Sequence, residues 1–427
     1  MEARIHHTLQ TVIVKMVTGG SDDNTGEIMN ETATKEMENT SEDSVFPTPE
    51  ALRQRFLALE TELNEVVLGR PDVVRGLLLG LLSGNHVFLL GPPGTAKSLL
   101  LDSLCYRLGG ARIYKRLFTA YTQPEEVFGP VRISGLKQDR FERRIEDYLP
   151  DVHLGFIDEV WKAGSPILNT LLKVLNERKF ENDTYTVDCP LRLALFASNE
   201  TPSSSELEAL YDRIALRFRV GEPLLARDWE TMYLGRTRSA DECEVEVSLE
   251  ELDAARDLVR QTVEFPVKVA KKVRKLGSRL NDEGYVISSR RECQLRLAVQ
   301  AHAWLEGRDS VSIEDLLLPY SATVWRTEEE IAPGQALVEE TVAPSFYKAH
   351  HGLKVARKAS REFNRAGRMR SSDKLDYQAA AVQQVAKVRA VLPHILEEAS
   401  SAEKPRIRKI IETVEIISDK LVKKVKQ

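Results

Sequence analysis

The stretch that decides the fold is GPPGTAKS (91–98), which follows the apolar run HVFLL (86–90) and precedes the helical pattern LLLDSLCYRL (99–108). An apolar strand, a glycine-rich turn and a helix, in this order, are typical of a loop that wraps phosphate groups with backbone N–H donors. The helix N-terminus adds its positive end to such a loop. The strict pattern has glycine at position 96, where this chain has Ala96. On its own, the near-match also fits a glycine turn before a helix.

Two acids end a second apolar run, because LGFI (154–157) is followed directly by Asp158 and Glu159. In the phosphate-binding interpretation, Lys97 contacts the β- and γ-phosphates of a nucleotide. The Ser98 hydroxyl ligates Mg²⁺, and Asp158 does so through water. Glu159 is then placed to polarise an attacking water. The alternative is a pair of solvated acids at the end of a strand.

Two further polar residues follow apolar patterns downstream. Asn199 comes after LRLALFA (191–197), so its amide can orient a water between Glu159 and the γ-phosphate. Arg213 lies in ALYDRIALRF (209–218), and an arginine at a subunit edge can reach the γ-phosphate of a neighbour. Taken alone, Asn199 fits a turn cap and Arg213 fits a surface ion pair.

Short apolar runs alternate with helical patterns through residues 47–222, which predicts an α/β fold with a parallel sheet covered by helices. We expect a helical lid at 223–330 and a basic helical region at 331–427. Two segments read as antiparallel hairpins added to the sheet, at 130–145 and 179–190. Thr48 and Ser312 are the expected caps of two helices.

Charge is unevenly distributed along the 427 residues, whose net charge is −5. Residues 1–46 are acidic and poor in large apolar side chains, so we expect a disordered extension there. Residues 348–427 carry 19 basic and nine acidic side chains, which suggests an appended module with its own partner. Few aromatic residues accompany that charge, so nucleic acid is an unfavoured partner.

Cysteine and hydropathy patterns place the chain among cytoplasmic proteins. The four cysteines lie too far apart for zinc or redox motifs, and free thiols fit a reducing compartment. No apolar run is long enough for a membrane span. The histidines show no metal-binding spacing, which argues against a metal centre held by side chains alone. The four cysteines are Cys105, Cys189, Cys243 and Cys293.

Taken together, GPPGTAKS, LGFIDEVWKAGSPILNTLL, LFASNE and ALYDRIALRF resemble the MoxR family of AAA+ ATPases. EEVFGPVRISGL and DEVWKAG resemble its regulatory ATPase variant A (RavA) branch. The resemblance covers about residues 50–330 and implies an αβα P-loop core with a helical lid, assembling as a hexameric ring that uses ATP and Mg²⁺. The residues that the family's ATP-binding loop implies are Gly91, Pro92, Pro93, Gly94, Thr95, Ala96, Lys97, Ser98 and Leu99.

The resemblance also assigns roles outside the loop. Arg213 falls on the family's arginine finger and Asn199 on its sensor-1 position. Ser288-Ser289-Arg290 falls on sensor 2, where Arg290 would meet the γ-phosphate from the lid of the same subunit. The adenine would lie at Val67, Leu68 and Gly69. The segment 130–145 falls on an insertion in the family's second helix.

Two features depart from the RavA branch. Its members carry a small β-rich domain, within the C-terminal helices, that binds a lysine decarboxylase, and residues 335–427 have no strand-rich stretch of that size. The acidic N-terminal extension is also outside the family pattern. The implied function is ATP-driven remodelling or chaperoning of a partner protein, with a von Willebrand A domain as the family's frequent client. Two alternatives remain, namely a nucleotide-gated scaffold with little turnover and a motor subunit like that of magnesium chelatase.

Overall fold

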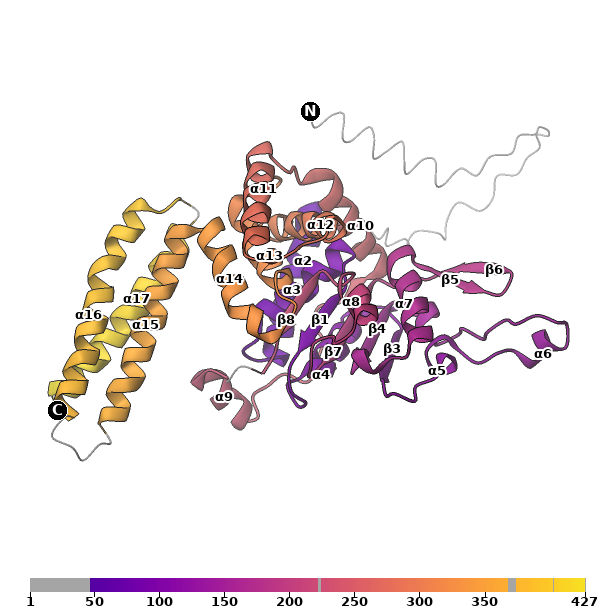
Figure 1. Cartoon of the computed structure of the whole chain (residues 1–427), viewed down its shortest axis with the longest axis horizontal. Helices are drawn as coiled ribbons and strands as arrows, with labels where there is room; N and C mark the ends of the chain where they lie inside the picture. Colours follow the sequence, from indigo (N-terminus) through magenta and orange to yellow (C-terminus); the bar gives the residue numbers. More distant parts are fainter. Residues whose placement is uncertain (1–46, 222–223, 368–373, 402, 427) are drawn as a thin grey trace, which may run out of the picture. The chain divides into compact units, whose positions relative to one another are not determined.

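A parallel five-stranded sheet forms the centre of the computed structural model, which describes residues 47–221, 224–367, 374–401 and 403–426 (Figure 1). The described residues belong to one compact unit. The extension expected at 1–46 lies outside them. The strand order is β3-β4-β7-β1-β8, with every neighbouring pair parallel. The strands are β1 (Val87–Leu90), β3 (Ile113–Leu117), β4 (Leu154–Asp158), β7 (Leu193–Ser198) and β8 (Leu216–Arg219).

The three expected strands occupy the middle of this sheet because both of their faces are covered. All four residues of β1 and all six of β7 are buried, as continuous apolar strands of a parallel sheet should be. The sequence reading did not identify β3, whose exposed Lys115 and Arg116 mark it as an edge strand. It also missed β8 on the opposite edge. The predicted α/β fold class is confirmed.

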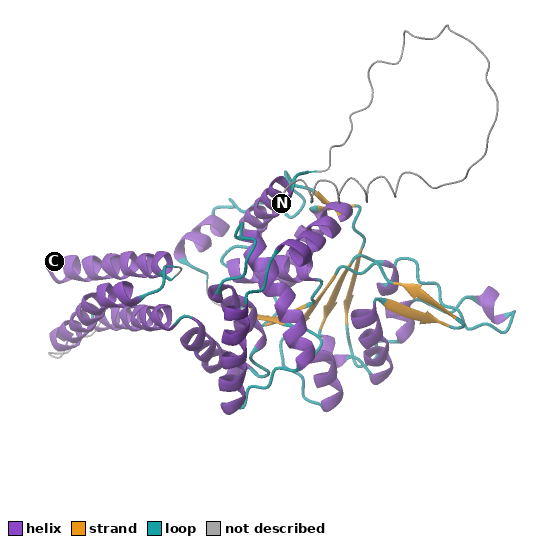
Figure 2. Cartoon of the chain, turned by 90° about the horizontal axis from the view of Figure 1, so that it is seen from above, coloured by secondary structure: helices purple, strands orange, loops and turns teal. Residues whose placement is uncertain are grey.

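Helices cover both faces of the sheet (Figure 2). Thr48 caps the first of them, because its Oγ1 accepts a hydrogen bond from Ala51 N at 3.2 Å. The helices of this part of the chain are α2 (Pro49–Val66), α3 (Pro71–Ser83), α4 (Lys97–Tyr106), α5 (Pro124–Phe128), α6 (Ile133–Leu136), η1 (Leu149–Asp151), η2 (Val160–Lys162), α7 (Ser165–Glu177), α8 (Ser205–Tyr211) and α9 (Ala226–Tyr233).

The two expected hairpins form, but neither joins the central sheet. Strands β5 (Lys179–Asn182) and β6 (Tyr185–Asp188) pair only with each other and stand apart from the sheet in Figure 2. The segment 130–145 closes with an antiparallel bridge between Val131 and Arg143 and carries α6 within it. The β5–β6 hairpin packs against the core through Phe180, which is buried and stacks on Phe128 of α5.

A second group of helices follows the sheet. Ser312 has the expected capping box, in which its side chain and that of Asp315 each bond the other residue's backbone. The boundary expected at residue 331 falls inside α14. The elements of this group are α10 (Leu249–Thr262), α11 (Val267–Asp282), α12 (Ser289–Leu305), η3 (Ile313–Leu316), α13 (Leu317–Thr323) and α14 (Glu328–Val342).

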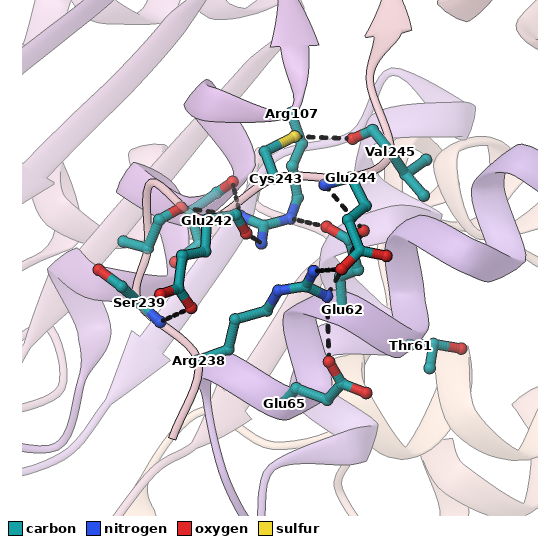
Figure 3. Close-up of polar contacts among 12 residues, drawn as sticks. Thr61, Glu62, Glu65, Arg107, Arg238, Ser239, Glu242, Cys243, Glu244 and Val245 are labelled. Atoms are coloured by element: carbon teal, nitrogen blue, oxygen red, sulfur yellow. Dashed lines mark hydrogen bonds and ion pairs between the residues drawn. The ribbon is translucent and has the colours of Figure 1, made fainter. Parts of the chain in front are cut away.

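A buried ion network fastens the connection between these two parts (Figure 3). Arg107, at the end of α4, is fully buried and donates from Nε to Glu62 of α2 at 2.7 Å. Its other nitrogens donate to the carbonyl oxygens of Ala240 and Glu242 at 2.9 and 2.6 Å. Strand β2 (Leu108–Gly109) continues from Arg107 and pairs with β9 (Val247–Ser248), just before α10. The linker is therefore held against the core by a paired, buried charge.

The last three helices have a small apolar core of their own. They are α15 (Pro344–Ala366), α16 (Lys374–Glu398) and α17 (Lys404–Lys426), and Figure 1 shows them side by side. The basic side chains Lys354, Lys358, Arg361 and Arg365 lie exposed along α15, as the charge pattern suggested. The fully or nearly buried residues between these helices include Ala349, Leu353, Phe363, Val385, Leu392, Ile407 and Val414.

Gly76 lies where α3 packs tightly against the sheet. A Cβ at this position would lie 2.0 Å from Cζ of Phe218 on β8. We therefore expect Gly76→Ala to lower the free energy of unfolding by about 1–3 kcal/mol, measured by urea denaturation. The control is Gly277→Ala on α11, where the nearest atom to the new Cβ is 4.0 Å away and alanine should stabilise the helix by up to about 1 kcal/mol. Equal effects of the two substitutions would contradict this packing.

Candidate functional site

The carboxyl ends of β1, β7 and β4 bring the expected site residues to one edge of the sheet. In the register of these strands, Leu90 pairs with Ser198 and Asp158 pairs with Ala197. The loop that begins at Gly91 is joined directly to this edge, because Gly91 N donates to Ser198 O at 2.9 Å. Sites in open parallel sheets lie at the carboxyl ends of the strands, so this edge is the candidate site.

The loop 91–98 turns sharply and encloses the side chain of Lys97. Gly91 is packed so closely that a Cβ there would lie 2.1 Å from Val220 O. Gly94 and Ala96 have φ values of +77° and +64°. The backbone at position 96, where the consensus has glycine, is therefore left-handed, and alanine adopts this conformation here. Lys97 is 8% exposed, and its Nζ donates to the carbonyl oxygens of Gly91 and Pro92.

The donor set at this edge fits a magnesium nucleotide. The exposed Ser98 lies in the first turn of α4, where backbone N–H groups lack helical partners and favour an anion. Asp158 ends β4, and carboxylate and hydroxyl oxygens are ligands that Mg²⁺ prefers. Positive φ values at two positions of the loop turn its amides as a phosphate cradle requires.

Glu159 leaves the strand in a left-handed conformation, with φ of +53°. Its backbone N donates to Asp158 Oδ1 at 3.0 Å. Its carboxylate is approached by Ser198 Oγ at 3.4 Å and by Lys162 Nζ at 3.5 Å. Strained left-handed residues other than glycine concentrate at functional sites, because the surrounding structure must hold them there.

Ser198 is a site residue that sequence reasoning missed. It is fully buried at the end of β7, and its hydroxyl lies between Glu159 and the backbone N of Glu200, which donates to it at 3.2 Å. Asn199 follows it and is exposed at the same edge. The available signal was the position of Ser198 directly before Asn199, but only the strand register shows which acid it contacts.

Arg213 and Arg290 are brought together within one chain. Asp212 accepts a hydrogen bond from Ser288 Oγ at 3.0 Å and forms an ion pair with Arg291 Nε, also at 3.0 Å, which docks the start of α12 beside Arg213. Arg213 Nη1 donates to Ala209 O at 2.6 Å. Burial and then the nearby charge of Arg290 lower the pKa of Arg213, while Asp212 opposes them. The positive charges of the two guanidinium groups repel each other, so a bound anion would stabilise both.

The expected adenine segment lies against the segment that follows β8. Val67 is buried, whereas Leu68 and Gly69 are partly exposed. Gly69 has φ of +70°, and a Cβ there would lie 2.8 Å from Cδ2 of Leu224 and 3.4 Å from Oδ2 of Asp228. A side chain at position 69 would therefore be strained by the positive φ and would require the Leu224 side chain to move.

Residues 54–253 match the model of the MoxR domain found in MoxR–von Willebrand A–β-propeller ternary systems. The match begins in α2, spans the whole five-stranded sheet and ends in α10. This segment is therefore similar to the MoxR domain of those systems.

Other proteins and a solved structure are also similar to this chain. Two uncharacterized proteins of Methanocaldococcus jannaschii are 34% identical over 220 residues and 33% identical over 208 residues, each covering 48% of this chain. The chain spans about half the length of these curated relatives, 53% and 54%. A crystal structure of a "putative ATPase" from Cytophaga hutchinsonii has a TM-score of 0.55 at 20% identity, covering 69% of this chain and 95% of that one. At that identity the likeness shows the fold alone.

The described part of the chain contains neither a metal-binding cluster of side chains nor a membrane-spanning helix. No group of three or more His, Cys, Asp or Glu side chains there is arranged to hold a metal ion. None of the helices described combines the length and the hydropathy that a bilayer span needs.

The left-handed Ala96 gives a prediction about the loop. Alanine in this conformation costs about 1–2 kcal/mol, whereas glycine adopts it freely but loses more entropy on folding. We expect Ala96→Gly to leave the free energy of unfolding unchanged or to raise it by up to about 1 kcal/mol. The control Ala386→Gly, on an exposed face of α16, should lower it by about 1 kcal/mol in the same thermal and urea melts. A comparable loss at both positions would contradict the left-handed geometry of Ala96.

Proposed function

We propose that this chain binds ATP with Mg²⁺ and hydrolyses it. The observation that carries the proposal is the register of β1, β7 and β4, which collects the loop, the acid pair and Asn199 at one sheet edge. ATP and Mg²⁺ would supply the γ-phosphoryl group and the charge that organises it. The match to the MoxR domain model and the similarity in fold to the putative ATPase of Cytophaga hutchinsonii support this proposal.

Each residue at the edge has a role that its position allows. The backbone of 91–99 and the Lys97 ammonium would hold the phosphates, and Ser98 with Asp158 would hold Mg²⁺. Glu159 would take the proton of the attacking water, with Ser198 fixing one of its carboxylate oxygens. Asn199 would orient that water. Val67, Leu68 and Gly69 would lie against the adenine.

A ring assembly gives Arg213 its role. An arginine finger stabilises charge on a neighbour's γ-phosphate, so hydrolysis would require subunits to meet through this face. We propose a homo-oligomer, a hexamer by family likeness. The resemblance assigns Arg290 to the nucleotide of its own subunit, whereas its place beside Arg213 gives it access to the same phosphate. In the second arrangement the two guanidinium groups would share one phosphate, whereas in the first they would act on different nucleotides.

The client is proposed to be a protein with a von Willebrand A domain, because the matching MoxR model belongs to ternary systems that contain one. The RavA-like branch rests on the EEVFGP and DEVWKAG segments alone. We propose that 47–222 and 223–330 act as nucleotide-binding core and lid, and that the basic helices of 331–427 engage the client. Free thiols at the four cysteines suit a reducing cytoplasm.

A scaffold with little turnover is the second candidate. It would keep the nucleotide loop but would not need a placed base. The left-handed Glu159 and its contact with Ser198 favour the hydrolytic reading. The third alternative, a motor subunit like that of magnesium chelatase, is not favoured by any contact described above.

Replacing the proposed base separates binding from hydrolysis. Glu159→Gln keeps the shape of the side chain but cannot accept a proton, so ATP binding should persist while turnover falls roughly 10²–10⁴-fold. Binding is measured by calorimetry and turnover by phosphate release. Glu177→Gln, an exposed glutamate at the end of α7, removes the same charge elsewhere and should leave turnover unchanged. Turnover of Glu159→Gln within about threefold of wild type would remove Glu159 from this role.

Mixing experiments test the role of Arg213 across an interface. Arg213→Ala and Lys97→Ala should each lose turnover, by roughly 10³-fold or more for the finger. Mixed together, they should recover part of it, because some interfaces then join an intact loop to an intact finger. The control mixture of Lys97→Ala with Glu159→Gln should not recover, since both residues act in the same subunit.

Failure of Arg213→Ala to recover in verified mixed rings would contradict a finger in trans. The same mixture made with Arg290→Ala locates that residue. Recovery with Lys97→Ala occurs only if Arg290 acts on a neighbour's nucleotide, and its absence places Arg290 at its own subunit's site.

A further inference from the structure

An aromatic cluster joins the acid pair to the segment that carries Arg213. Trp161 lies in η2, two residues after Glu159, and is 7% exposed. Its ring centroid is 5.4 Å from that of Tyr211, edge-on at 84°, and 5.2 Å from that of Phe88 on β1. Tyr211 ends α8, two residues before Arg213. The cluster thus gives Glu159 and Arg213 a shared buried neighbour.

The ring of Tyr211 is also held by a buried arginine. Cζ of Arg217 lies 3.5 Å from the centroid of that ring. Arg217 is 1% exposed and donates to the carbonyl oxygens of Tyr211 at 2.7 Å, Ile214 at 3.0 Å and Trp325 at 2.8 Å. A desolvated cation is attracted by the negative face of an aromatic ring. Tyr211 therefore has little freedom to move apart from its neighbours.

The residues around Arg213 are fixed by the same surroundings. Asp212 is tied to Ser288 and Arg291, and Arg213 O accepts from Gln294 Nε2 at 3.3 Å. The rings of Phe88 on β1 and of Trp161 also pack against Tyr211, at 5.6 and 5.4 Å, and of these two Trp161 is the one that follows the acid pair. A shift of Trp161 would change the packing of Tyr211 and with it the placement of Arg213, because tightly packed interiors transmit displacement.

We propose that Trp161 is a positioning residue that sets Arg213 through Tyr211, linking the arginine finger to the acid pair of its own subunit. This inference rests on the proposed ATP hydrolysis. Trp161 would touch neither nucleotide nor water. Replacing Trp161 should therefore change the turnover rate and leave the nucleotide affinity unchanged. A displacement of about 1 Å in a catalytic group can cost about 10²-fold in rate.

The test compares Trp161→Leu with Trp161→Phe in the full chain. Leucine removes the edge contact with Tyr211, so we expect kcat to fall by about tenfold or more while the Kd for ATP changes by less than about twofold. Phenylalanine keeps an aromatic edge and should restore kcat to within about threefold of wild type. If Trp161→Leu fails to fold in a thermal melt, Trp161→Met, an unbranched gap-filler, carries the same expectation.

Trp304→Leu is the matched control for lost packing. Trp304 lies on α12 and is 6% exposed. Its ring makes an edge-on contact with Phe56 at 5.8 Å and is not part of the cluster around Tyr211. It should lose a similar amount of stability but keep its kcat. Equal loss of kcat in Trp304→Leu and Trp161→Leu would overturn the proposal, because the effect would then be general destabilisation.

A double-mutant cycle identifies the residue through which Trp161 acts. In an Arg213→Ala background, Trp161→Leu should cost less than about twofold in kcat, because the group that it positions is already gone. A full additional loss would overturn the proposal. If wild type itself shows no hydrolysis, the proposed function fails. If wild type hydrolyses ATP and Trp161→Leu matches it, only this inference fails.

Discussion

The parallel pairing of β7 between β1 and β4 is the constraint on which the rest of the site depends. A shift of two residues in either register would leave the faces of the strands unchanged but would separate Asp158 from the loop and Ser198 from Glu159. The hydrogen bond from Gly91 N to Ser198 O continues the ladder into the loop itself. Glu159 and Ala96 take left-handed conformations at the same edge, and the buried strands around them supply the rigidity that holds them.

Much of this arrangement could be predicted from the sequence because each central strand is an apolar run, which leads into the glycine-rich loop after β1 and ends in a polar residue in β4 and β7. The edge strands could not be predicted. Charged side chains interrupt the hydrophobic pattern of β3, and β8 is too short to show a clear pattern. The placement of the two hairpins outside the sheet also escaped prediction, because pairing partners are a property of the folded chain. The same holds for Ser198, whose partner Glu159 lies on another strand.

Buried arginines carry the contacts that the sequence pattern could not show. The side chains of Arg107 and Arg217 are both almost completely buried, but they have different structural roles. Arg107 is paired with Glu62 and ties the linker to the core, so its charge is compensated. Arg217 lies on the ring of Tyr211 among carbonyl oxygens, and burial lowers its pKa to about 10. Arg217 therefore stays charged at neutral pH. It links β8 to the segment after α13, because it donates a hydrogen bond to Trp325 O.

The central claim is that the loop at the end of β1 serves hydrolysis of a magnesium nucleotide. The most direct measurement is steady-state phosphate release from ATP with Mg²⁺ by the full chain and by Lys97→Ala, at a protein concentration where both have the same oligomeric state. The account predicts release by the wild type and a loss of roughly 10²-fold or more in Lys97→Ala. Equal rates of phosphate release by the two proteins would contradict it.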